Sequence, residues 1–348
     1  MRLPQTTAVS EEVGVPQSIG TPRTTLVGVL LMLFACGTAV AQDDGPRVNW
    51  KAMDGANVVA FQYLPFDGDT SNTRIFDPLH YTYPESQFQA NLFLLTFAHH
   101  FTLFNRTAVV GGSLLGGNID VESVINPFGV GPSVRLKEAA HGFGDPVAQL
   151  TVNLAGAPAI RSLYDVSKYE PKAVLDLSVI GNLPIGEYDS EKVLNLGLNR
   201  WWTRIGLPFT YHIGPYVPGY RTSIEVTPSV FVFASNDDFL GRTLDTDPLF
   251  QIEGHVTRDF AAHLFGSFDV LYRNGALPQI DHVDFGEKLD LLSAGFTLDY
   301  TVNDNFGVRV SYHSLVGGGS DIEGDMFRIN FNFGWHPLIE NIKKLGGG

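Results

Sequence analysis

One short group of residues has the types that catalysis needs. Tyr312-His313-Ser314 places a base next to a hydroxyl nucleophile. A nucleophilic site requires the base within hydrogen-bond reach of the serine and a third residue that orients the base. In an extended chain, neighbouring side chains point to opposite faces, so His313 and Ser314 would be separated. The sequence also has no HExxH, Walker or GxSxG motif. We therefore predict that the protein is not an enzyme.

Aspartates gather in several segments rich in turn residues, where they could bind a divalent cation. None of these segments has the pattern of a calcium-binding loop, and the ten histidines show no metal-ligand spacing. We expect solvated loop charges, with Ca²⁺ or Mg²⁺ bridging to lipopolysaccharide as the alternative, and we predict no metal or cofactor. The pairs are Asp67 and Asp69, Asp237 and Asp238, Asp245 and Asp247, and Asp281 and Asp284.

A larger set of polar and charged residues recurs at every second position of apolar segments. In 327–335 one face is Phe, Ile, Phe, Phe and Trp, and the other is Arg, Asn, Asn and Gly. A period of two is typical of β-strands, not of helices. Twelve segments fit it: 56–64, 87–98, 107–116, 145–154, 175–182, 194–199, 223–232, 250–257, 263–272, 291–300, 306–314 and 327–335.

The connections between these segments favour a barrel in a membrane. Short turns near 258–261 and 301–305 alternate with long loops, as in outer-membrane barrels. The polar faces are rich in Asn, Ser, Gly and Thr rather than in the Lys and Glu of a soluble sandwich, and aromatic residues stand at strand ends. We predict an all-β fold, a single transmembrane antiparallel β-barrel of about 12 strands. The segment 205–219 could add two more strands, which would make 14.

The same alternation predicts which charged residues line the interior. If the turn at 301–305 is centred near Asp304, Asp299 lies opposite Arg309 and forms a cross-strand ion pair. The same counting about 320–321 places His313 opposite Arg328. These charges either solvate and plug the interior or form a constriction that tunes permeation. The lumen-lining candidates are Asp176, Glu225, Glu253, His255, Asp269, Asp299, Arg309, His313 and Arg328.

Some inward positions are apolar instead. Phe231, Phe233, Phe265 and Leu271 either form a path for a small aromatic ligand or fill space beneath loops. A barrel of twelve strands lies between the side-chain-filled barrels of eight and the open porins of sixteen. We therefore expect a narrow pore that loops close in part.

The N-terminal region has the features of an export signal. Residues 26–35 are an apolar core that follows Arg23, and Ala39-Val40-Ala41 provides a cleavage site. We predict a signal peptide over 1–41, with a lipoprotein box ending at Cys36 as the alternative. Cleavage after Ala41 removes the one cysteine and leaves no thiolate for disulfides or metals. The net charge of −14 argues against nucleic acid as a partner.

Several phrases resemble an outer-membrane channel family associated with the meta pathway of phenol degradation. They are Gly142-Phe143-Gly144-Asp145, the run 183–188, the run 195–201, and Asn236-Asp237-Asp238-Phe239 with 247–251 after it. Their order and spacing over about residues 50–335 carry the resemblance. It implies a β-barrel that passes aromatic or other hydrophobic compounds across the outer membrane. Barrels of this type commonly end on the aromatic of the last strand, whereas here 336–348 follow Trp335.

These observations predict three regions: the signal peptide, a barrel over 42–335 and a periplasmic tail over 336–348. We expect the outer membrane of a Gram-negative bacterium, with lipid, lipopolysaccharide, a small hydrophobic solute and the barrel assembly machinery, through the C-terminal strand, as partners. The predicted function is passive uptake of small hydrophobic or aromatic compounds. The alternatives are a structural or adhesive barrel and a soluble periplasmic β-domain.

Overall fold

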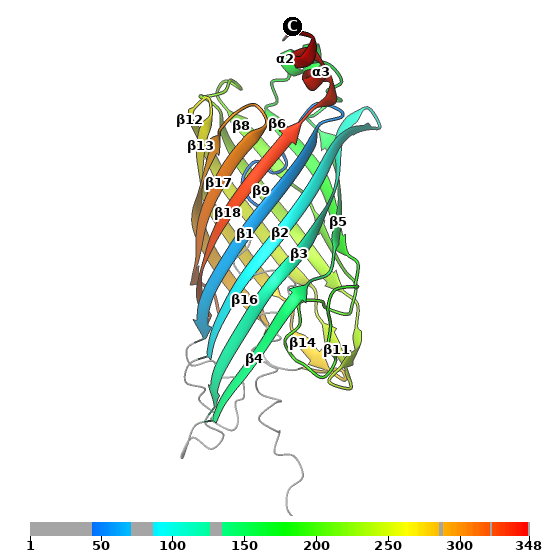
Figure 1. Ribbon diagram of the computed structural model, residues 1–348, viewed down its shortest axis with the longest axis vertical. Coiled ribbons are helices and arrows are strands. Elements are labelled where there is room, and N and C mark those ends of the chain that lie inside the picture. The colour runs from blue at the N-terminus through cyan, green and yellow to red at the C-terminus, as the bar shows by residue number, and fades with distance from the viewer. Residues whose placement is uncertain (1–43, 71–85, 126–133, 285–287, 321, 347–348) are drawn as a thin grey trace, which may run out of the picture.

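A computed structural model describes residues 44–70, 86–125, 134–284, 288–320 and 322–346. Long, strongly tilted antiparallel strands form a closed barrel (Figure 1). Each strand of the ring pairs with its neighbour, and the last strand pairs with the first, so the wall has no free edge. The predicted signal peptide lies outside the described residues.

The ring has twelve strand positions, as the sequence predicts. Strands β7 and β8 share one position, because both pair with β6 on one side and β9 on the other. The positions are β1 (Asn57–Thr70), β2 (Ser86–Leu103), β3 (Arg106–Ile125), β5 (Val147–Ala155), β6 (Ala173–Asn182), β7 (Trp202–Gly206) with β8 (Phe209–Ile213), β9 (Thr222–Phe233), β12 (Leu249–Ala261), β13 (Leu264–Gly275), β16 (Leu289–Thr301), β17 (Phe306–Gly317) and β18 (Glu323–Trp335).

One of the predicted strands is wrong. Residues 194–199 form bends and irregular backbone, and the ring position between β6 and β9 is taken by 202–213. The alternation of leucine with polar residues in 194–199 has another cause. Leu194 is fully buried inside the barrel, and Leu196 is nearly so. The backbone between them does not pair with a strand. The segment 205–219 holds the end of β7 and all of β8, but these two strands share one position of the ring, so the segment does not raise the number of positions to 14.

The two ends of the barrel differ in their connections. At one end, tight turns join β2 to β3, β12 to β13 and β16 to β17, and the helices α2 (Leu163–Lys168) and α3 (Pro337–Gly346) lie there (Figure 1). The other end carries the long connections. These include β4 (Val134–Phe143), which pairs with the far part of β3, and a small sheet of β10 (Asn236–Phe239), β11 (Arg242–Thr246), β14 (Pro278–Ile280) and β15 (Val283–Asp284). In outer-membrane barrels short turns face the periplasm and long loops face the outside.

Among the described residues, neither helix has the length and apolar composition needed to cross a membrane.

The outer face of the ring is an apolar belt. Phe93, Leu95 and Phe97 of β2 stand 43–47% exposed, and Phe331 and Phe333 of β18 are 41% and 50% exposed. Their neighbours along each strand point inward and are more buried. An exposed apolar surface of this extent is a binding surface for lipid or protein rather than a normal soluble face. The alternation is thus apolar outward, as a membrane barrel requires.

The register of the last three strands tests two predicted pairs. Asp299 lies opposite Arg309, and Arg309 Nε donates to Asp299 Oδ2 at 2.9 Å, so this ion pair is confirmed. The pairing of His313 with Arg328 is wrong, since His313 lies opposite Met326 and Arg328 opposite Ser311. The β17–β18 loop is centred one residue earlier than predicted. Ile322, directly before β18, packs in the apolar core.

Candidate functional site in the barrel interior

The interior of the barrel has two layers. Toward the long-loop end, inward side chains form one apolar cluster, here called the apolar tier. Toward the short-turn end they are charged or hydroxyl-bearing, here called the polar tier. The apolar tier includes Leu64, Phe66, Phe88, Leu92, Ile119, Val121, Leu194, Leu196, Trp202, Phe231, Leu249, Leu289, Leu291 and Met326, all less than 9% exposed. The alternation predicts a mainly polar interior with a few apolar positions, because it assigns the face of each side chain but not its depth.

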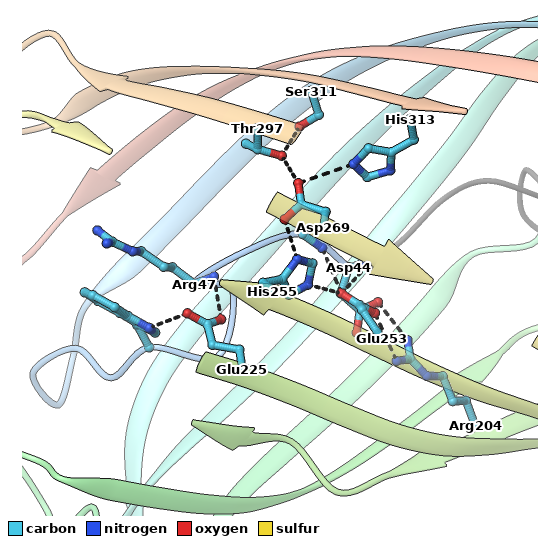
Figure 2. Close-up of polar contacts among 12 residues, drawn as sticks. Asp44, Arg47, Arg204, Glu225, Glu253, His255, Asp269, Thr297, Ser311 and His313 are labelled. Carbon is cyan, nitrogen blue, oxygen red and sulfur yellow. Dashed lines mark hydrogen bonds and ion pairs between the residues drawn. The ribbon is translucent and has the colours of Figure 1, made fainter. Parts of the chain in front are cut away.

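The polar tier is filled by the chain that precedes β1. Residues 44–56, here called the plug, run inside the barrel from the level of Glu253 to the short-turn end, where Gly55 N donates to His100 O. The plug is attached to the wall by carboxylates. Glu253 Oε1 accepts from the amides of Asp44 (2.9 Å) and Gly45 (3.2 Å), and Glu225 Oε2 accepts from the amide of Arg47 (2.8 Å). Figure 2 shows these contacts.

Arg47 is the most extensively held side chain of the plug. Its NH1 donates to Asp259 Oδ1 at 2.6 Å and its Nε to Thr257 Oγ1 at 3.0 Å. The guanidinium lies 3.9 Å from the centre of the Phe265 ring and 4.2 Å from that of Trp50. A planar cation between two aromatic faces combines an ion pair with cation–π attraction. Arg47 therefore fixes the plug to β12 and β13.

Two further contacts attach the plug along its length. Trp50 Nε1 donates to Glu225 Oε1 at 3.0 Å, and Lys51 Nζ donates to Asp176 Oδ2 at 2.6 Å. The side chains of Lys51 and Asp176 are only 3% and 2% exposed. Breaking a buried pair by removing one partner costs about 3–5 kcal/mol, because it leaves an uncompensated charge. The wall and the plug thus depend on each other for charge balance.

An aromatic cluster closes the short-turn end around the plug. Trp50 lies 5.2 Å from the His212 ring and 5.6 Å from Tyr216, and Tyr216 packs edge-on against Tyr169 of the β5–β6 loop. Burial raises the pKa of the Tyr169 phenol far above its ordinary value. The cluster ties the plug to two loops at the short-turn end through ring contacts.

A chain of buried acids and histidines crosses three strands beside the plug (Figure 2). His255 Nδ1 lies 2.7 Å from Asp269 Oδ1, and its Nε2 lies 2.8 Å from Glu253 Oε1. Ionised carboxylates only accept hydrogen bonds, so an imidazole that serves both must carry two protons. His313 Nε2 approaches Asp269 Oδ2 at 3.4 Å from across β16. The geometry fits a positive His255 that joins two negative groups.

Gly295 makes the approach of His313 to Asp269 feasible. It lies between the two residues on β16, and an added Cβ would stand 2.0 Å from His313 Cδ2 and 2.2 Å from the carbonyl oxygen of Tyr312. We expect Gly295→Ala to lower the temperature at which the folded, faster-migrating gel band disappears, because overpacking a filled interior costs about 1–3 kcal/mol.

The matched control for this substitution is Gly254→Ala on β12. There the nearest atom to an added Cβ is 3.8 Å away. Equal unfolding midpoints for the two variants would show that the wall at Gly295 yields freely, contrary to the expectation.

The structure places the predicted interior residues as follows. Eight of the nine lumen candidates have a residue exposure below 9%: Asp176, Glu225, Glu253, His255, Asp269, Asp299, His313 and Arg328. Arg309 is half-buried beside Asp299, with 13% of its side chain exposed. Glu225, Glu253 and Asp176 hold the plug, and His255, Asp269 and His313 form the buried chain. Whether these charges tune permeation remains a prediction.

The three phenylalanines proposed as a path are not continuous. Phe231 belongs to the apolar tier, and the half-buried Phe233 packs beside it at 6.4 Å. Phe265 lies in the polar tier beneath the Arg47 guanidinium. Among the described residues, apolar side chains therefore line the interior only in its half near the long loops.

A segment here called the strap, residues 183–201, lies over the apolar tier between β6 and β7. Asp145 holds it at two points, Gly186 and Leu198, and also binds Asn182 at the end of β6. Its Oδ1 accepts from Gly186 N at 2.9 Å, and its Oδ2 accepts from Leu198 N at 3.1 Å and from Asn182 Nδ2 at 2.8 Å. Inside this arrangement Leu94, Leu115, Leu196 and Trp202 line a cavity of about 30 Å³. That volume is too small for an aromatic solute, so side chains fill most of the space beneath the strap at this point.

The phrases that suggested a family come together at the strap. Glu187 N donates to Phe143 O and Gly197 N to Glu187 O. Asn236 receives a hydrogen bond from Asn199 Nδ2 and donates to Tyr188 Oη. Glycines permit the close approach: a Cβ on Gly186 would stand 2.6 Å from the carbonyl carbon of Gly144. The phrases are therefore the parts of one folded unit that positions the strap.

The sequence analysis missed the plug and the strap. Residues 44–56 carry no alternation, and only Arg47, Trp50 and Lys51 stand out as types that bind carboxylates. Their partners lie on strands more than 120 residues away. A sequence signal existed for the strap, namely the clustering of glycine and asparagine in phrases that a strand would not tolerate. It marks turns, but it does not show which wall they touch.

Within the ranges that the structure describes, no three His, Cys, Asp or Glu side chains gather as metal ligands. His313 points inward and is 2% exposed. Ser314, the next residue on β17, points to the other face of the strand.

Residues 67–331 match the model of a family described as "Putative MetA-pathway of phenol degradation". The chain belongs to this family. The match confirms the resemblance predicted from the sequence. Among curated proteins no sequence matches the chain.

One solved structure shows the same fold, and two others align less closely. The COG4313 outer membrane channel from Pseudomonas putida F1 aligns with a TM-score of 0.67 and 15% identity, over 84% of this chain and 100% of that chain. The transport unit of the autotransporter AIDA-I from Escherichia coli aligns with a TM-score of 0.46 and 6% identity, over 89% of this chain and 98% of that one. A KdgM porin aligns with a TM-score of 0.42 and 7% identity, over 80% and 99%.

The closed ring, the apolar outer belt and the family define this member of the phenol-degradation family as a porin-like outer-membrane β-barrel. The predicted outer-membrane location follows from the same observations. The barrel interior, with its plug below and strap above, is the candidate functional site.

Proposed function

We propose that this barrel is a passive outer-membrane channel for small hydrophobic compounds, aromatic ones among them. The observation that carries the proposal is the apolar tier. Its side chains are buried inside the barrel beneath the long loops, where a channel for sugars or ions would present polar groups. An apolar interior at that level offers a solute arriving from outside a favourable transfer from water. The family and the fold of the channel from Pseudomonas putida F1 support the same assignment.

Passage through the barrel requires two movements. The strap covers the apolar tier, and the plug fills the polar tier. Both segments are held by hydrogen bonds and ion pairs to the wall rather than by strand pairing, and such contacts can be exchanged without opening the barrel. We infer that the strap controls access from outside and that the plug controls release to the periplasm.

The test uses intact cells and the fluorescent apolar probe N-phenylnaphthylamine, which the lipopolysaccharide leaflet excludes. Cells that express the protein should take up the probe faster than cells with an empty vector, and a disaccharide should show no matching increase. Equal probe uptake in the two strains would reject the channel and favour a structural or adhesive barrel. Recovery of the protein from the periplasm without detergent would instead favour a soluble β-domain.

A further inference from the structure

Two buried arginines lie at the boundary between the two tiers. Arg204 of β7 and Arg273 of β13 are 6% and 3% exposed. Arg204 Nε donates to Ser229 Oγ at 3.0 Å, and Arg273 Nε donates to Gln251 Oε1 at 2.8 Å. Ser229 and Gln251 lie opposite each other on adjacent strands, so the two arginines approach this pair from either side.

Apolar side chains border both arginines. Arg204 lies opposite Ile180 on one side and opposite Phe231 on the other, with its guanidinium 5.5 Å from the Phe231 ring centre. Arg273 lies opposite Leu291, which is 2% exposed in the apolar tier. Two buried guanidinium groups thus lie directly beside the apolar tier. This combination suits a ligand with an apolar body and an anionic end.

A carboxylate of the protein already occupies this position. Asp44, at the tip of the plug, accepts from Arg204 NH1 at 2.7 Å through its Oδ1, while Glu253 lies farther away, 3.7 Å from Arg204 NH2 (Figure 2). The Asp44 side chain is 33% exposed, in contrast to the 7% of Arg204 and the 2% of Glu253. An exposed carboxylate on a buried arginine is a contact that an incoming anion can replace. The Asp44 carboxylate stands in for that anion.

We propose that the solutes of this channel include amphipathic anions. The apolar part lies in the apolar tier, and the anionic group replaces the Asp44 carboxylate at Arg204, beside Arg273. Replacement removes the side-chain contact that holds the plug tip, and only the two amides of Asp44 and Gly45 on Glu253 then remain among the tip contacts described above. Binding of the solute thus weakens the plug at the point where the solute must next pass. This inference rests on the proposed function and names its substrate class.

The experiment is equilibrium dialysis of three labelled probes against the full protein in lipid nanodiscs, with empty nanodiscs subtracted. The first probe is octanesulfonate, which is a permanent anion. The second is octanol, which is neutral, and the third is octyltrimethylammonium, which is a permanent cation. Wild-type protein should bind octanesulfonate more tightly than octyltrimethylammonium. Arg204→Gln should weaken octanesulfonate binding by about tenfold or more, since a charge-assisted hydrogen bond is lost. Octanol binding should change by less than about twofold, since it depends on apolar contacts.

Asp44→Asn separates recognition from a merely structural role. This variant removes the charge of the internal competitor and keeps Arg204, so octanesulfonate should bind several times more tightly. Arg204→Gln and Asp44→Asn both break the same ion pair, and a structural role would move the affinity in the same direction for both. The matched controls are Arg242→Gln and Asp281→Asn, an exposed pair at 2.7 Å near the long loops, for which no change is expected.

The outcomes separate the inference from the function beneath it. Binding of octanol without binding of octanesulfonate, preference for the cation, or parallel effects of the two variants would overturn the inference and leave a channel for neutral solutes. Binding of no probe above empty nanodiscs would overturn both.

Discussion

Replacing Arg47 with alanine is expected to raise the ion conductance of the reconstituted barrel by about tenfold or more, because the plug would lose two charge-assisted hydrogen bonds and two cation–π contacts and would leave its site more often. The substitution removes the donor to Asp259 and Thr257 and the cation between Phe265 and Trp50. Asp259 keeps a partner in Arg221 at 2.8 Å, so the wall itself should remain folded. Single-channel recording in planar bilayers measures the change.

Arg258→Ala provides the matched control. Arg258 precedes Asp259 on the same strand, but its guanidinium contacts Tyr220 O and Thr222 Oγ1 at an exposed position. We expect its conductance to equal that of the wild type. If Arg47→Ala kept the wild-type conductance while its gel band stayed heat-modifiable, Arg47 would not anchor the plug.

Replacing Asp145 with alanine is expected to release the strap. Two donors of the strap, Gly186 N and Leu198 N, would lose their acceptor at once, while Asn182 Nδ2 would keep Arg200 O. Each buried donor left unsatisfied costs about 1–3 kcal/mol. Local opening of the strap should therefore become more frequent by about tenfold or more. Trypsin added to intact cells should then cleave after Lys192 at a correspondingly higher rate, since its side chain is already 50% exposed.

Asp120→Ala is the control for this substitution. Asp120 lies exposed on β3 and accepts from Asn118 Nδ2 at 2.9 Å. Its loss should leave the cleavage rate unchanged. A strap equally resistant in the Asp145→Ala protein would mean that its glycine packing alone, such as that of Gly186 on Gly144, is sufficient to hold it.

The agreement between sequence and structure is closest where a strand has one lipid face and one inner face. The alternation in 291–300, 306–314 and 327–335 predicts β16, β17 and β18, and equal counting from the tight turn at 301–305 predicts the Asp299–Arg309 pair. Tight turns fix the register, because few residues can be added or lost in them. The loop at 318–322 is longer, so counting across it misplaced His313 by two positions on its partner strand.

The strap shows how alternation can mislead. Leu194 and Leu196 repeat at the spacing of a strand, and they do so because one side of an irregular segment packs into the barrel. Alternation of apolar and polar residues indicates that one side of a segment is buried. It does not show that the backbone pairs with another strand. The hydrogen-bond partners decide whether a strand forms, and here the backbone is bound to Asp145 and Glu187 instead.

The sequence by itself determined the class of this protein. Outward phenylalanines and inward polar residues along twelve strand positions require a closed wall in lipid, because each strand must satisfy its backbone with neighbours and its side chains with two different solvents. Only the tertiary structure decided what fills that wall. The plug contacts, the chain of His255 with its two acids and the strap anchor at Asp145 all join residues distant in sequence, and their partners depend on depth in the barrel. A period of two records the face of each side chain but not its depth.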